Sequence, residues 1–292
     1  MDGADAMKQI ILVTAAILAP LWLATPVEAQ IIFTPPNLNP PDNPPTVGLS
    51  SGASRHPFVQ QGKPLTALIP KTQLALTVAE YPTFFINVPQ ASEQTGVFTL
   101  LDEDDKIVYE TRLTIPSQAG VVSFSLPNTG NLAPLEVGKS YQWYFTIVYD
   151  FNDHSTDLSV QGWIQRVEPS LDLVRKIEQA APKNRPALYA AAGIWHETLA
   201  TLAELRRDTP NDATLAQQWA ELLKSEAVEL DEIAQEPLLG SLSALDQIPA
   251  LPPETENVRE RSEAREPGIG EGQFSPPELE RGTRTTTGGG SR

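Results

Sequence analysis

The chain has 292 residues, a formal net charge of −16 at pH 7, 27 prolines and no cysteine. Most of the negative charge falls between residues 64 and 240. This argues against binding to nucleic acid or to anionic lipid, because proteins bind both through clusters of lysine and arginine. Without cysteine no disulfide can form, so a hydrophobic core must stabilise the fold.

An export signal is expected over residues 1–29. Lys8 supplies a positive charge, residues 10–24 form an apolar run, and Val27-Glu28-Ala29 is a small-residue cleavage site. The predicted cut lies between Ala29 and Gln30. The protein is therefore expected in the periplasm or the medium.

Two details refine this expectation. Asp2 and Asp5 fit a signal peptide poorly, so Met7 is the expected true start. The apolar run contains Pro20 and is shorter than the roughly 20 residues that span a bilayer. We therefore expect no stable membrane anchor after cleavage.

Residues 30–63 are expected to form a proline-rich, disordered linker, because the prolines crowded between Pro35 and Pro45 favour extended polyproline geometry. From residue 64 to residue 168, apolar and polar residues alternate in short runs, as in half-buried strands. The expected strands lie near 65–69, 73–79, 83–88, 96–101, 106–115, 120–126, 141–149 and 160–167. This spacing predicts an antiparallel, immunoglobulin-like β-sandwich.

Helical periodicity follows over residues 169–240. It predicts a short tetratricopeptide-like helical hairpin, with Gly193 at the turn and Pro210 closing the second helix. Asp212 is expected to cap a third helix. A solenoid needs several repeats, so a single hairpin is expected to pack on the sandwich. The predicted fold class is α+β, mainly β, followed by a disordered tail over residues 241–292.

Five strings carry a resemblance to a known family: Pro64–Pro70, Leu76–Phe85, Gly162–Val167, Gly193–Trp195 and Leu202–Arg207. Together they resemble the cyanobacterial domain of unknown function numbered 928 over roughly residues 64–240. The resemblance implies an exported protein with no assigned activity.

The densest group of functional side chains lies in the predicted loop at residues 150–157. Candidate binding residues there are Asp150, Asp153, His154 and Asp157. His154 is a candidate general base, and the carboxylates are candidate base orienters or metal ligands. These residues are too close in sequence to form a catalytic triad among themselves. A polar turn is the competing interpretation, and neither a catalytic residue nor a cofactor is predicted.

Two aromatic residues complete the candidate site. Tyr144 and Phe85 are expected on the face opposite their apolar neighbours, where they could stack on sugars.

We therefore expect an exported, non-enzymatic protein-interaction module whose helical hairpin binds an envelope or secreted protein. One alternative is a carbohydrate-binding domain, with or without Ca²⁺. A further alternative is a hydrolase or metal enzyme centred on His154.

Overall fold

The computed structural model describes residues 30–38, 50–51, 63–90, 94–130, 132–152 and 154–247. All of them belong to one compact unit, Met1–Ala250. The expected signal peptide, Asp153 and the tail beyond Gln247 lie outside the described residues.

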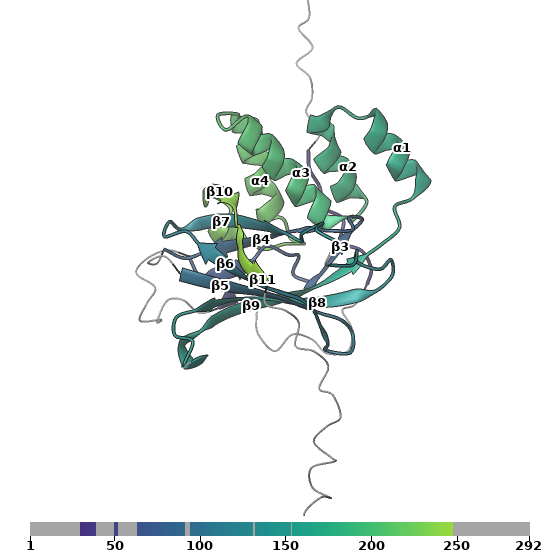
Figure 1. Ribbon diagram of the computed structural model, residues 1–292. Coiled ribbons are helices and arrows are strands. Elements are labelled where there is room, and N and C mark those ends of the chain that lie inside the picture. The colour runs from purple at the N-terminus through teal and green to yellow at the C-terminus, as the bar shows by residue number, and fades with distance from the viewer. Residues whose placement is uncertain are drawn as a thin grey trace, which may run out of the picture. The chain divides into compact units, whose positions relative to one another are not determined.

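Two sheets and a group of helices make up this unit (Figure 1). The five-stranded sheet has the order β1 (Ser50–Ser51), β2 (Leu65–Ala67), β4 (Thr83–Val88), β7 (Gly120–Ser125) and β10 (Leu238–Ser241). The six-stranded sheet has the order β11 (Ala244–Gln247), β6 (Ile107–Ile115), β5 (Gln94–Leu101), β8 (Ser140–Val148), β9 (Leu158–Arg166) and β3 (Leu74–Thr77). The chain is thus mainly β, and β2 to β9 lie where the alternation predicts strands.

Buried aromatic residues join the two sheets. The ring of Phe84 in β4 lies 4.8 Å from that of Phe98 in β5 and 5.2 Å from that of Trp143 in β8, measured between ring centres. All three side chains are fully buried. They form the centre of the core because alternate residues of each strand point to the same face.

The sheets are mixed, which corrects the expectation of a purely antiparallel sandwich. The pairs β3–β9 and β7–β10 are parallel, while the other strand pairs among the described residues are antiparallel. Alternation along one strand reports which face is buried but carries no information about the direction of its neighbour.

Four α-helices follow the sandwich: α1 (Leu171–Gln179), α2 (Arg185–Ala191), α3 (Trp195–Asp208) and α4 (Ala213–Lys224). Short 3₁₀ turns are η2 (His154–Thr156), η3 (Pro182–Asn184) and η4 (Asp231–Ile233). The Asp212 carboxylate caps α4 as predicted, accepting the amide hydrogens of Thr214 and Leu215 at 2.8 and 3.3 Å. Gly193 forms the turn between α2 and α3 with a φ of 74°.

The helices cover the five-stranded sheet, as Figure 1 shows. Phe85 of β4 packs against Trp219 of α4, with 6.2 Å between ring centres. Arg207 of α3 donates to the Ser123 hydroxyl of β7 at 2.8 Å. Residues of α3 and α4 belong to the same hydrophobic cluster as those of both sheets. The helices therefore pack on the sandwich, as the sequence predicts.

The segment Gln30–Leu38, here called the N-terminal strap, differs from the expected disordered linker. Ile31 and Phe33 are buried in the main core, and the Phe33 ring meets Trp195 edge-on at 4.8 Å. The Thr34 amide donates to the Ala190 carbonyl at 3.1 Å. The reason is local: two apolar side chains at alternate positions precede the prolines, and burial of apolar surface orders them.

The disordered tail was expected to begin at residue 241, but the structure has ordered strands up to Gln247. Residues 238–247 form β10 and β11, which pair with β7 and β6 at one edge of each sheet. Edge pairing uses backbone groups, which composition does not report. Among the described residues, no helix has the length and apolar character needed to cross a membrane.

Candidate functional site

The loop that joins β8 to β9 holds the residues singled out in the sequence. Oδ2 of Asp157 lies 2.7 Å from Nδ1 of His154. The other carboxylate oxygen, Oδ1, accepts the Tyr149 amide hydrogen at 3.3 Å. The Asp150 carboxylate accepts the Asn152 amide hydrogen at 2.8 Å, as in an Asx turn. The structure thus brings Asp150, His154 and Asp157 into one loop, and each carboxylate binds a backbone amide of that loop.

This arrangement orders the loop. Asp157 is mostly buried and ties the end of β8 to the 3₁₀ turn η2, whereas 67% of the His154 side chain is exposed. A histidine oriented by a carboxylate is half of a hydrolytic machinery, which also requires a nucleophile within about 3 Å. Within the described ranges, no group of three or more His, Asp or Glu side chains has the geometry of a metal site. The loop is held in one conformation by its own hydrogen bonds.

Phe151 is a candidate site residue that the sequence reasoning missed. It lies in the same loop with 51% of its surface exposed, and the guanidinium carbon of Arg112 in β6 lies 5.1 Å from the centre of its ring. The available signal was an aromatic residue isolated in a polar loop, between Asp150 and Asn152. Aromatic residues and arginine are enriched in the cores of protein interfaces.

Tyr144 lies on the outer face of the six-stranded sheet, beside Thr99 and Gln161 on the neighbouring strands. It is half-buried, and this burial, with a smaller contribution from the charge of Asp105, raises the pKa of its hydroxyl. An accessible ring at this position remains suitable for stacking on a planar ligand.

Phe85 does not face solvent, contrary to the expectation. Only 3% of its surface is exposed, because both faces of β4 are covered: the other sheet lies on one and the helices on the other. Phe85 therefore belongs to the core between the five-stranded sheet and α4, and it cannot contact a ligand together with Tyr144.

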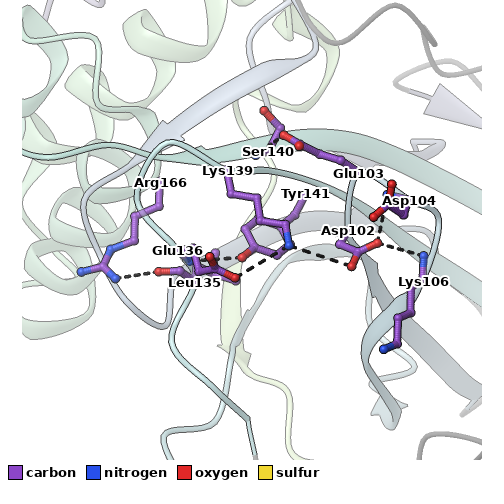
Figure 2. Close-up of polar contacts among 10 residues, drawn as sticks. All are labelled: Asp102, Glu103, Asp104, Lys106, Leu135, Glu136, Lys139, Ser140, Tyr141 and Arg166. Carbon is purple, nitrogen blue, oxygen red and sulfur yellow. Dashed lines mark hydrogen bonds and ion pairs between the residues drawn. The ribbon is translucent and has the colours of Figure 1, made fainter.

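The charged residues at the other end of β8 hold loops together (Figure 2). Asp102 accepts the amide hydrogens of Asp104 and Lys106, both at 3.0 Å, and closes the turn between β5 and β6. The Lys139 amine lies 3.9 Å from Asp102 and 3.7 Å from Glu136, so it bridges that turn and the segment before β8. These carboxylates are engaged within the fold.

Arg166 and Tyr141 also hold the segment before β8, which contains Leu135 and Glu136. Arg166 donates to the Leu135 carbonyl at 2.6 Å, and the Tyr141 hydroxyl accepts the Glu136 amide hydrogen at 3.1 Å (Figure 2). The segment is thereby fixed to β8 and β9.

Two titratable residues at the start of α3 connect this helix to the sandwich. His196 is buried, its Nδ1 lies 2.9 Å from the Thr83 carbonyl, and burial lowers its pKa to about 4. Since the Thr83 carbonyl can only accept, Nδ1 carries the hydrogen of a neutral ring. Glu197 accepts from the Thr77 hydroxyl at 2.7 Å and the Ala79 amide at 3.0 Å, while burial raises the pKa of its carboxyl. These contacts attach α3 to β3 and β4.

The comparisons with known proteins give one match. The family model described as Domain of Unknown Function (DUF928) covers residues 50–238. No curated protein and no solved structure matches the chain. Its function must therefore be argued from its own residues.

Proposed function

We propose, from the premise that the chain belongs to the family described as Domain of Unknown Function (DUF928), that it is an exported, non-enzymatic protein-interaction module. The observation that carries the proposal is the loop between β8 and β9, in which an exposed Phe151 is presented by a preorganised backbone. The expected partner is an envelope or secreted protein.

The loop suits recognition for two physical reasons. Phe151 offers a large apolar ring next to the Arg112 guanidinium, a pairing that favours burial against a partner. The hydrogen bonds of Asp157 and Asp150 hold the loop in place before binding, which reduces the entropy lost on association. The exposed His154 adds a polar group at the rim.

The strand order supports an immunoglobulin-like description of the sandwich. One sheet contains β2, β4 and β7 in this order, and the other contains β6, β5, β8 and β9, with the consecutive strands β8 and β9 side by side. The bond from the Glu136 amide to the Tyr141 hydroxyl near the start of β8 is similar to a tyrosine corner. In this description the Asp150–Asp157 loop occupies the position of a loop that variable domains use for recognition.

The helices have a different role in this proposal. The pair α2–α3 is joined by a turn at Gly193, but α2 has only 7 residues and the pair packs on the sandwich. We therefore assign to the helices the support of the five-stranded sheet, and to the loop the contact with the partner.

The compartment follows from the signal peptide. We propose cleavage between Ala29 and Gln30 and release into the periplasm or the medium. Intact-mass spectrometry of the exported protein should give a chain that begins at Gln30. A mass that retains residues 1–29 would contradict this.

The interaction is tested by crosslinked capture from native envelope and medium extracts, followed by affinity measurement with the captured protein. Phe151→Ser should weaken binding about tenfold or more, as expected for loss of an interface anchor. Leu171→Ser is the matched control, because Leu171 is 82% exposed on α1, and it should bind like the wild type. The proposal would be contradicted if Phe151→Ser bound the partner as tightly as the wild type, or if Leu171→Ser lost as much affinity as Phe151→Ser. Capture of polysaccharide instead of protein would also contradict it.

A further inference from the structure

A cleft lies between the N-terminal strap and the end of α4. None of its lining residues belongs to the Asp150–Asp157 loop. Its volume is about 590 Å³, within the range of ligand-binding clefts. One wall is formed by residues 30–33 and Pro35 of the strap, and the other by Lys71 and residues of the segment 221–227.

The strap lines this cleft with residues 30–33, which belong to no helix or strand. Ile31 and Phe33 point into the core, whereas Ile32 between them is 62% exposed. The amide groups of Ile31, Ile32 and Phe33 form no hydrogen bond with any residue that the structure describes. An extended backbone with free amide groups can accept an additional strand. Pro35, which has no amide hydrogen, limits this edge to the residues before it.

The position of the strap is fixed from the helical side. The Thr34 amide donates to the Ala190 carbonyl, and a methyl group placed on Gly193 would lie 2.9 Å from the Thr34 carbonyl oxygen. The absence of a side chain at Gly193 therefore permits the close approach of the strap. The open edge is held in place before any ligand arrives.

The opposite wall carries more negative than positive charge, with Glu221 and Glu226 beside Lys71. The Lys71 amine is engaged by Glu229 at 2.8 Å, an interaction that raises its pKa. Glu221 accepts the neutral amide of Gln217 at 2.7 Å, and the charge of Glu226 adds a smaller contribution to the raised pKa of Lys71. Both carboxylates are exposed at the cleft.

The uncharged residue Ser225 also lines the cleft. The Ser225 hydroxyl oxygen is buried and has no hydrogen-bond partner among the described residues, although Ser225 lines the cleft. Such groups are normally satisfied in folded proteins or in their complexes.

We propose that this cleft binds an extended, basic segment of a partner protein by strand addition to the strap. The backbone of the segment pairs with residues 31–33, and its lysine or arginine side chains meet Glu221 and Glu226. This second binding site does not depend on the loop that contains Phe151.

The probe is a dye-labelled, acetylated (Lys-Val)₄ peptide, with binding to the full chain followed by fluorescence anisotropy at about 0.15 M salt, where the Debye length is about 8 Å. It should bind, whereas (Glu-Val)₄ should not. (Lys-Pro)₄ keeps the charge but lacks the amide hydrogen at every second residue and favours polyproline geometry over a strand, so it should bind more weakly. Phe151→Ser should leave peptide binding unchanged, which separates this site from the proposed function.

The site is located with charge-matched variants. The double variant Glu221→Lys/Glu226→Lys should weaken binding about tenfold or more, and Glu178→Lys/Glu204→Lys, which changes the net charge equally, should bind like the wild type. Hydrogen exchange of the amides of residues 31–33 should slow when the peptide saturates the chain. The proposal would be overturned if (Lys-Pro)₄ bound as tightly as (Lys-Val)₄, or if both double variants lost the same affinity. Unchanged hydrogen exchange at the amides of residues 31–33 would also overturn it.

Discussion

The indole nitrogen of Trp195 donates a 2.8 Å hydrogen bond to the carbonyl oxygen of Leu68, and both residues are buried. This bond joins the first turn of α3 to the segment after β2. Because a buried carbonyl without a partner is costly, the bond makes the helices part of the same core as the sandwich. Removal of the helices would therefore expose that core, so point variants are the appropriate tests of function.

Trp195→Phe should lower the free energy of unfolding by about 1–3 kcal/mol, because the Leu68 carbonyl loses its donor. Trp219→Phe is the matched control: the Trp219 indole nitrogen is buried and has no acceptor among the described residues, so this variant loses no hydrogen bond with them. Urea unfolding followed by circular dichroism measures both. Equal destabilisation by the two substitutions would refute a special role for the Trp195 bond.

Stability should decrease in acid because of His196. Its pKa is about 4 in the folded protein and 6.5 in the reference state, so the unfolded chain binds more protons between these values. The stabilisation is present above pH 6.5 and is lost as the pH falls towards 4, by about 3 kcal/mol. The readout is the wild-type stability minus that of His196→Gln, measured at pH 7 and pH 4. A difference that does not change with pH would contradict a neutral, buried imidazole.

Glu197 contributes with the opposite sign. Burial raises the pKa of its carboxyl, so protonation favours the folded state as the pH falls through that raised value. Glu197 is common to the wild type and His196→Gln, so its contribution cancels in their difference. In Glu197→Gln, the amide oxygen can still accept from Thr77 and Ala79, and the acid loss of stability should become steeper than in the wild type.

The strap should stabilise the fold although it lies in a proline-rich segment. Phe33→Ala removes a buried ring that contacts Trp195 and should cost about 3–5 kcal/mol. Ile32→Ala changes the exposed neighbour and should stay within about 0.5 kcal/mol of the wild type. Thermal or urea unfolding of the two variants tests this contrast, and a neutral Phe33→Ala would show that the strap does not pack in solution.

Asp157 should control the order of the recognition loop. Asp157→Ala removes the acceptor of both the Tyr149 amide and His154, and hydrogen exchange at the end of β8 should accelerate. His154→Ala removes an exposed partner and should change stability by less than about 1 kcal/mol, with little effect on exchange at Tyr149. Similar exchange in both variants would mean that the carboxylate does not hold the loop.

Much of the fold could be predicted because local patterns record it. Alternation located β2 to β9, and the Pro210–Asp212 segment located the start of α4. The parallel pairing of β3 with β9 could not be predicted, because strand direction depends on partners distant in the sequence. The same reason explains Phe85: period-two alternation places it opposite the inter-sheet core, but only the packing of α4 shows that this second face is also buried.

The candidate site was predicted in part. Composition pointed to the loop that contains Asp150 and His154, because polar residues that bind their own backbone concentrate in turns. It did not identify Phe151, whose importance depends on its exposure and on Arg112 from a strand far away in the sequence. The cleft beside the strap was also missed, since its two walls are about 190 residues apart in the chain.

The central claim, that Phe151 contacts a partner protein, is tested most directly by photocrosslinking in the native host. A benzoylphenylalanine placed at position 151 should yield, on irradiation, an adduct with one defined envelope or secreted protein. The same probe placed at the exposed position 171 on α1 should not give that adduct. No protein adduct from position 151, or the same adduct from both positions, would contradict recognition by this loop.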